Sequence, residues 1–225
     1  MLQNGSPRDF PILQATACNI PATAQAYSLN FTALPSQGRP LGYLTVWPSG
    51  QPLPVVSTLN ASTGTTTANA AIVPAGTSGD IMAYAYGNTT HLIIDINGYF
   101  AAAGSAPNPM ALYTIQPCRI LDTRNPPPGH QFEGELTVPV LDGPCPLPAP
   151  QAAYVLNATV VPPKALGYLT LWPSGEQQPV VSTLNAGDGA VTSNMAIVPS
   201  TNGLIDSYAS DLTQLIVDAF GYFAP

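Results

Sequence analysis

The sequence predicts an all-β protein built from two tandem β-sandwich-like domains of the same fold. Segments of four to eleven residues rich in Val, Ile, Thr and Tyr are bounded by Pro, Gly or Asn, as in short strands joined by tight turns. No window carries a Pro-free apolar stripe at helical spacing. Most of the chain also occurs twice, so the fold of the first half is expected again in the second.

The internal repeat predicts the domain organisation. Residues 43–60, YLTVWPSGQPLPVVSTLN, return as residues 168–185, YLTLWPSGEQQPVVSTLN, with 14 of 18 positions identical. We expect a first unit over residues 1–103 and a second over residues 104–225, with the boundary in the linker AAAGSAPNP, residues 101–109. Further matched positions are Cys18 and Cys145, Tyr27 and Tyr154, Asn30 and Asn157, Asp95 and Asp218, and Phe100 and Phe223.

The expected strands follow one another in the same order in each copy. In the first copy, residues 22–34 alternate partly between apolar and polar, whereas residues 42–47 and 91–100 alternate more regularly. The segments PVVSTLN and TANAAIVP lie between them. Seven or eight such strands in about 100 residues are typical of a β-sandwich, with a barrel as the alternative.

The second copy begins with a strand that the first copy lacks. Residues 111–129, ALYTIQPCRILDTRNPPPG, have no counterpart before the first copy, which starts near SPRDFPIL, residues 6–13. That segment aligns with GELTVPVL, residues 134–141. A sheet lacking a strand exposes unpaired backbone groups. We expect an edge of the first unit to be completed by a neighbouring subunit, or by a strand encoded upstream in a longer precursor.

Composition excludes several classes of function. The charged fraction is 8% and the hydrophobic fraction 45%, which argues against disorder. The net charge is −7 with only five Lys and Arg, so no nucleic-acid partner is expected. No apolar run approaches the roughly 18 residues needed to cross a bilayer, so membrane insertion is not expected. Few lysines and many Thr, Ser, Asn and Pro residues predict an extracellular or cell-surface protein.

Several motifs of the second copy occur together in a known module. PCRILDTR at residues 117–124, then GYLTLWPSG, STLN and the closing LIVDAFGYF resemble the repeat of secreted bacterial cell-surface proteins. In that family a PCR-x-x-DTR start and an x-x-D-x-x-GYF end bracket each unit. The resemblance covers nearly the whole chain, as one complete unit and one lacking its PCR-x-x-DTR segment. It implies an extracellular, all-β, repetitive protein and no particular activity.

The three cysteines are distributed unevenly between the copies. Within the complete unit, Cys118 and Cys145 are expected to form a disulfide. Cys18 occupies the position of Cys145 without a partner in its own unit, so it is a free thiol or an intermolecular link. Pairing of Cys118 with Cys18 would instead mean that PCRILDTR serves the first unit. Three dispersed Cys and two distant His give no zinc-ligand spacing, so no metal or cofactor is expected.

Asp95 and Asp218 occupy equal places on otherwise apolar terminal segments. Neither copy offers a second carboxylate for catalysis, so a structural role is expected for both. Arg119 and Arg124 are the natural partners of Asp218, with Asp122 beside them, and in a chain so poor in charge we expect this cluster to be internal. No G-x-S-x-G motif or phosphate-binding glycine loop occurs, and an enzyme is not expected.

An aromatic stripe at strand spacing leaves two functions open. Tyr43 and Trp47 share one face with Thr45, as Tyr168 and Trp172 do with Thr170. These stripes form core, a contact between domains or subunits, or a platform for glycan rings. The leading hypothesis is a structural subunit that polymerises with itself into a filament, pilus-like fibre or surface coat, through β-rich contacts that include strand addition. The alternative is a secreted carbohydrate-binding or adhesin module.

Overall fold

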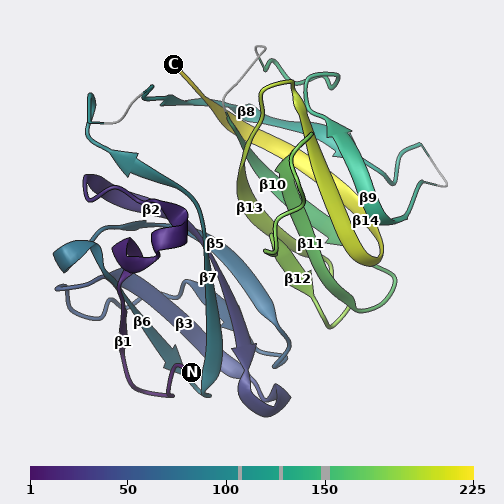
Figure 1. Cartoon of the computed structure of the whole chain (residues 1–225). Helices are drawn as coiled ribbons and strands as arrows, with labels where there is room; N and C mark the ends of the chain where they lie inside the picture. The colour runs from purple at the N-terminus through teal and green to yellow at the C-terminus, as the bar shows by residue number, and fades with distance from the viewer. Residues whose placement is uncertain (106–107, 127–128, 148–152) are drawn as a thin grey trace. The chain divides into compact units, whose positions relative to one another are not determined.

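A computed structural model describes residues 1–105, 108–126, 129–147 and 153–225. Strands hold 57% of the residues and helical turns 5%, so the expected all-β fold is present. The chain divides into two compact units, Met1–Pro109 and Met110–Pro225 (Figure 1). The division falls at the end of the linker, whereas the sequence placed the boundary after residue 103. Residues 106–107 of that linker lie outside the described residues.

Unit 1 contains two antiparallel sheets. The first has the order β1-β6-β3-β4, formed by Arg8–Phe10, Ile81–Tyr86, Leu41–Pro48 and Leu59–Ala61. The second has the order β5-β2-β7, formed by Thr67–Pro74, Ala24–Pro35 and Thr90–Ala101. Short 3-10 turns connect them: η1 at Ile12–Gln14, η2 at Thr16–Cys18, η3 at Ser36–Gly38 and η4 at Thr77–Gly79.

Both sheets of unit 1 contribute to one buried apolar cluster. Tyr27, Leu29 and Phe31 of β2 meet Leu44 of β3 and Ile81 of β6, all of them nearly inaccessible to water. Alternate residues of each strand point to this cluster because strand side chains have a period of two. A core shared by two sheets is the arrangement expected of a β-sandwich.

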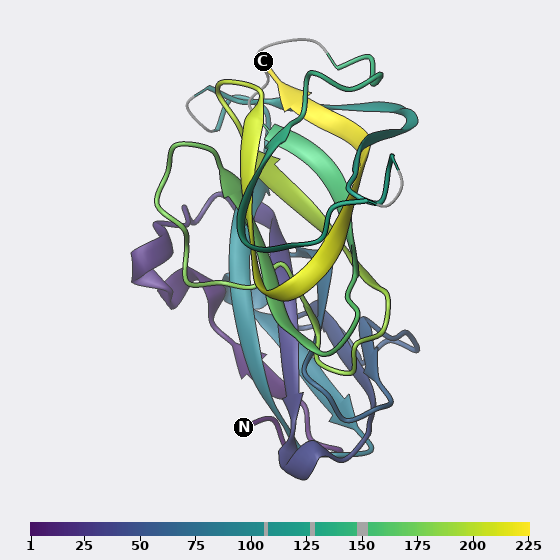
Figure 2. The ribbon, with the colours of Figure 1, turned by 90° about the vertical axis from the view of Figure 1, so that its right-hand side faces the viewer.

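Unit 2 repeats this arrangement with one strand bridging both sheets. The path is β12-β11-β14-β10-β13, with β8 and β9 also paired to β14. The early part of the 21-residue β14 pairs with β9 and β11, and its later part pairs with β10 and β8, so the strand bends between the two sheets (Figure 2). The strands span Ala111–Asp122, Phe132–Pro139, Ala153–Val161, Leu166–Pro173, Leu184–Ala186, Thr192–Pro199 and Leu204–Ala224, from β8 to β14.

The pairings of the two units correspond strand by strand. Phe10 of β1 lies opposite Ile81, and Val138 of β9 lies opposite Ile205, which is the register that aligning SPRDFPIL with GELTVPVL predicts. Strands β2 to β5 match β10 to β13 in order, and β6 with β7 match the two parts of β14. Strand β8 has no counterpart in the described part of unit 1. No helix among the described residues is long and apolar enough to cross a membrane.

Candidate functional site: the β8 edge of unit 2 and its open equivalent in unit 1

Strand β8 closes one edge of unit 2. It pairs antiparallel with the later part of β14, with Leu121 opposite Val217 and Arg119 opposite Asp218. Its side chains Ile115, Ile120 and Leu121 pack against the core of the unit. β8 therefore supplies both backbone partners and apolar cover to β14.

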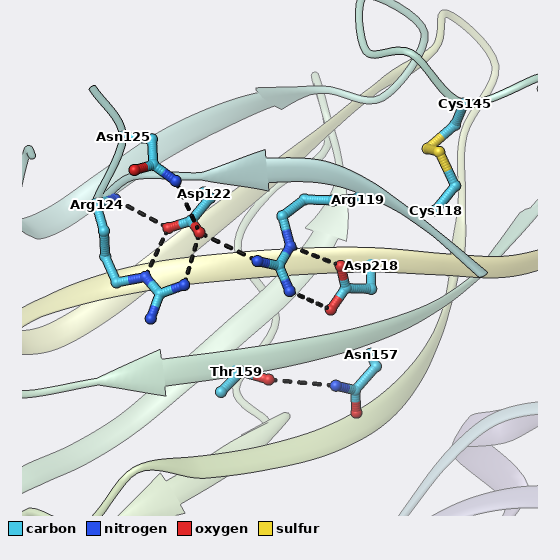
Figure 3. Close-up of polar contacts among 9 residues, drawn as sticks. All are labelled: Cys118, Arg119, Asp122, Arg124, Asn125, Cys145, Asn157, Thr159 and Asp218. Carbon is cyan, nitrogen blue, oxygen red and sulfur yellow. Dashed lines mark hydrogen bonds and ion pairs between the residues drawn. A yellow bond between two sulfur atoms is a disulfide. The ribbon is translucent and has the colours of Figure 1, made fainter. Parts of the chain in front are cut away.

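A disulfide anchors β8 to the segment that precedes β10. Cys118 and Cys145 are bonded, with their Cα atoms 5.5 Å apart and a sequence separation of 27 (Figure 3). Closing a loop of that length stabilises the folded unit by about 3.5 kcal/mol in the chain-entropy model. This is the pairing expected within the complete unit, and a disulfide fits an oxidising, extracellular environment.

Arg119 joins β8 to β14 through a bidentate ion pair. Its Nε donates to Asp218 Oδ1 at 2.9 Å and its Nη2 donates to Asp218 Oδ2 at 3.2 Å (Figure 3). The hydrogen bond to Asp218 raises the pKa of the Arg119 guanidinium. On the other side of β14, Asn157 of β10 lies opposite Asp218. Asp218 thus lies between Asn157, its neighbour in β10, and the Arg119 cation of β8.

Asp122 organises the end of β8. Its two carboxylate oxygens accept hydrogen bonds from Arg124 Nε at 2.8 Å, Arg124 Nη2 at 2.7 Å and Arg119 Nη1 at 3.2 Å. The Arg124 backbone N–H and the Asn125 amide also donate to it, at 3.1 and 3.2 Å. The hydrogen bonds from Arg124 lower the pKa of the Asp122 carboxyl to about 2.

The location of this cluster differs from the sequence-based expectation. Only Asp122 is enclosed, with 5% of its side chain exposed, whereas the Arg119 and Arg124 side chains are 49% and 42% exposed. Arg124 pairs with Asp122 and not with Asp218. Because β8 is an edge strand, long side chains on its outer face keep their guanidinium groups in water. The cluster lies at the surface of unit 2 rather than inside it.

The equivalent edge of unit 1 is open. From residue 93 to residue 101, β7 pairs only with β2 among the described strand pairings. Ile93 is 48% exposed, whereas its counterpart Ile216 is 6% exposed. The side-chain carboxylate of Asp95, the counterpart of Asp218, has no hydrogen-bond or ion-pair partner among the described residues, and burial raises the pKa of this carboxyl. A partly buried carboxylate without a cation is an energetic cost to unit 1.

Cys18, the counterpart of Cys145, ends the 3-10 turn η2. It is exposed and carries a free thiol, whereas Cys145 is 8% exposed and bonded to β8. Unit 1 therefore contains a free cysteine, a carboxylate without a cation and a strand edge with one partner. Their equivalents in unit 2 are the residues that contact β8.

The tryptophans of the aromatic stripes are buried, as in the alternative that places these stripes in the core. Trp47 and Trp172 are 5% and 3% exposed, and their indole N–H groups donate to the carbonyls of Gln51 and Glu176. The segment after each Trp folds back across the outer face of its own strand, where Thr45 donates to the Val56 carbonyl at 2.6 Å. Of the stripe residues, only the tyrosines are partly exposed. The ring centroids of Tyr43 and Tyr86 lie 5.2 Å apart in a stacked arrangement, and those of Tyr168 and Tyr208 lie 5.7 Å apart.

Sequence reasoning missed one repeated surface feature. Val55 and Val180 are fully exposed at matched positions of the segment that covers the strand. The PVV triplet present in both copies was the sequence signal. A short apolar run is normally predicted to be buried, because the sequence does not show whether another segment covers it.

Unit 1 also has a hollow of about 590 Å³, bordered by Leu13, Gln25 and Ser78, with no ionisable side chain on its wall.

Comparisons with known proteins leave the function to be argued from the site. No protein-family model matches the chain, and the search of curated proteins finds no significant relative. Within the described residues, no group of three or more His, Cys, Asp or Glu side chains is placed to hold a metal ion. The feature that distinguishes the two units is the sheet edge, which β8 closes in unit 2 and which is open along β7 in unit 1.

Proposed function

We propose that the protein is a structural subunit of an extracellular assembly, such as a filament, pilus-like fibre or surface coat. The observation that carries the proposal is that β7 has one strand partner along residues 93–101, while the matching part of β14 has two. An unpaired edge with an exposed Ile93 is a ready template for a strand from another chain.

The contact made in this way would be heterologous. Pairing β7 with any strand of a neighbour other than its β7 joins two different surfaces. Such contacts grow into linear arrays unless the rotation between subunits closes a ring. The charged fraction of 8% adds little repulsion to oppose growth.

An extracellular, bacterial-surface setting is part of the proposal. The Cys118–Cys145 disulfide favours an oxidising compartment, and the motifs of the second unit resemble a repeat of secreted bacterial surface proteins.

Electron microscopy and sedimentation of the purified full-length protein test the proposal. We expect linear arrays whose amount rises with protein concentration. Ile93→Lys places a charge on the open edge and should abolish them, because edge lysines oppose strand pairing. Ile72→Lys is the matched control: Ile72 is 50% exposed on β5, the other edge strand of the same sheet, and its substitution should leave assembly intact.

Two outcomes would contradict the assembly proposal. If the wild-type protein stays monomeric at high concentration, the subunit contact that we propose does not form. Equal loss of arrays in both lysine variants would place the contact elsewhere than on β7.

Glycan binding is the alternative function, and burial of both indoles weakens it. It would depend on the stacked tyrosines, of which Tyr86 is 54% exposed. A glycan array separates the two functions. We expect no binding, and glycan binding that is lost in Tyr86→Ala would favour the adhesin alternative.

A further inference from the structure

We propose that unit 1 is the acceptor for one extended β8-type strand supplied by another polypeptide, which pairs with β7, forms a disulfide with Cys18 and places a guanidinium against Asp95. The inference rests on the proposed function, because it names the chemistry of the strand that the open β7 edge would take up. The incoming strand is defined by a cysteine followed directly by an arginine, as in Cys118 and Arg119 of β8.

The backbone of β7 has room for such a strand. In unit 2, a side chain at Gly221 would collide with the backbone oxygen of Tyr113 in β8, so glycine is what allows the two strands to approach. Its counterpart Gly98 would meet nothing within 4 Å. Neither glycine has a positive φ, so close approach of a neighbouring backbone is the physical use of glycine at this position.

The apolar face of β7 is only partly covered. Ile94 and Ile96 pack against the core of unit 1 and remain partly exposed, whereas their counterparts Val217 and Ala219 are completely buried. The difference is explained by β8, whose Ile115, Ile120 and Leu121 pack against the core of unit 2. A β8-type strand on β7 would bury the two isoleucines in the same way.

The charge of the edge selects a strand that carries arginine. Asp95 lies opposite Asn30 of β2, as Asp218 lies opposite Asn157 of β10. Only Asp218 has a bidentate arginine within the described residues. Because the two carboxylates occupy the same register position, the arginine of a β8-type strand would meet Asp95.

The thiol of Cys18 supplies the covalent step. Its thiolate attacks the cysteine sulfur of the incoming strand when that sulfur is held in a mixed disulfide with a small thiol. The new S–S bond forms as the small thiol leaves as its thiolate, so no separate oxidant is consumed.

The strand is assigned to a polypeptide other than this chain or an identical copy of it, because β8 is already engaged in each of them. Cys118 is bonded to Cys145, Arg119 is paired with Asp218, and the strand is in register with β14. Moving it to unit 1 would break each of these contacts to form equivalent ones.

A synthetic peptide tests the inference on the full-length protein. The probe has the sequence of residues 111–124, with its cysteine as a mixed disulfide with glutathione. We expect intact-mass analysis to show one peptide per protein, peptide mapping to place it on Cys18, and amide hydrogen exchange to slow along residues 93–101. A peptide with the same residues in scrambled order, also carrying the glutathione disulfide, should couple far more slowly.

Three variants isolate the contributions. Cys18→Ser should lose the covalent product yet keep reversible protection of β7. Asp95→Asn should weaken reversible binding roughly fivefold, the upper range for an exposed ion pair. In the free protein a Cβ at position 98 meets nothing within 4 Å, so Gly98→Val should keep the protein folded while capture of the peptide is lost.

The inference is overturned if the scrambled peptide couples as fast, if the peptide attaches at Cys118 or Cys145, or if Gly98→Val captures it like the wild type. These outcomes are separable from failure of the assembly proposal. Arrays that persist in Cys18→Ser, with no peptide capture by the wild type, defeat the inference alone. Specific capture by a protein that stays monomeric supports the inference and defeats the assembly proposal.

Discussion

At the scale of single residues, two equivalent aspartates have opposite environments. Asp218 is paired with Arg119 through two hydrogen bonds, whereas Asp95 is partly buried with no partner among the described residues. The same residue at the same register position is therefore stabilising in one unit and costly in the other. Only the presence or absence of β8 distinguishes them.

Substituting the two aspartates should have effects of opposite sign. Asp218→Asn leaves Arg119 without its carboxylate and should lower the free energy of unfolding by about 1 kcal/mol. Asp95→Asn should raise it at neutral pH, because burial raises the pKa of Asp95 and penalises its ionised form. The gain should vanish below the ordinary pKa of 3.8, where Asp95 is protonated in both states. Denaturant titrations at pH 7 and pH 3 measure both effects.

Asp122 should make unit 2 sensitive to acid. Its pKa is lowered to about 2 in the folded protein from 3.8, so the unfolded chain binds the proton first as pH falls. The stabilisation is complete above about pH 4 and is lost progressively toward pH 2. Stability measured across this window should fall more steeply for the wild type than for Asp122→Asn. If the free energy of unfolding falls equally with pH in both proteins, the pairing of the Asp122 carboxylate contributes little to stability.

At the scale of elements, β8 is the strand that distinguishes the two units. It gives β14 a second backbone partner, covers the core with three apolar side chains, and is tied to the fold by the Cys118–Cys145 disulfide. Strand β7 has the same inner apolar positions without this cover. An edge strand of this kind is usually protected in soluble proteins, and the proposed assembly would protect β7 by pairing it with a strand of another chain.

Removing the disulfide should destabilise unit 2 alone. The double substitution Cys118→Ser with Cys145→Ser releases the 27-residue loop and should lower the free energy of unfolding of unit 2 by about 3.5 kcal/mol. Hydrogen exchange, which follows each unit separately, should show faster exchange in β8 and β14 and no change in β2. Cys18→Ser, which removes a free thiol, is the control and should change neither.

At the scale of the whole molecule, sparse charge makes apolar and backbone contacts the main forces available for association. The net charge of −7 is spread over 225 residues with only five Lys and Arg. Five Lys and Arg residues are too few to form a basic footprint that would steer an anionic partner. Assembly through strand edges is consistent with such a surface.

Assembly should therefore depend weakly on salt. The Debye length falls from about 30 Å at 0.01 M to about 3 Å at 1 M ionic strength, which removes most charge–charge forces between exposed groups. We expect the protein concentration at half-assembly to change less than about fivefold over this range, which is the contribution of one exposed ion pair. Light scattering measures it, and dissociation of arrays at high salt would indicate a charge-driven contact instead.

Much of the fold followed from the sequence because the repeat supplied an internal alignment. The all-β class, the strand order within each copy, the equivalence of residues 6–13 and 134–141, and the lack of a β8 counterpart could all be argued from residue spacing. Strand periodicity and turn residues are local properties, so they are visible in one chain. The Cys118–Cys145 pair likewise follows once the complete unit is defined.

Tertiary structure alone decided which faces are covered and which charges meet. A period of two separates the faces of a strand containing Trp47, but it does not reveal that the following segment folds back over the outer face and buries the indole. Ion-pair partners depend on register, and two irregularities in the β8–β14 pairing place Arg119 opposite Asp218 and leave Arg124 with Asp122. Burial and pairing arise from segments distant in sequence, so local pattern does not determine them.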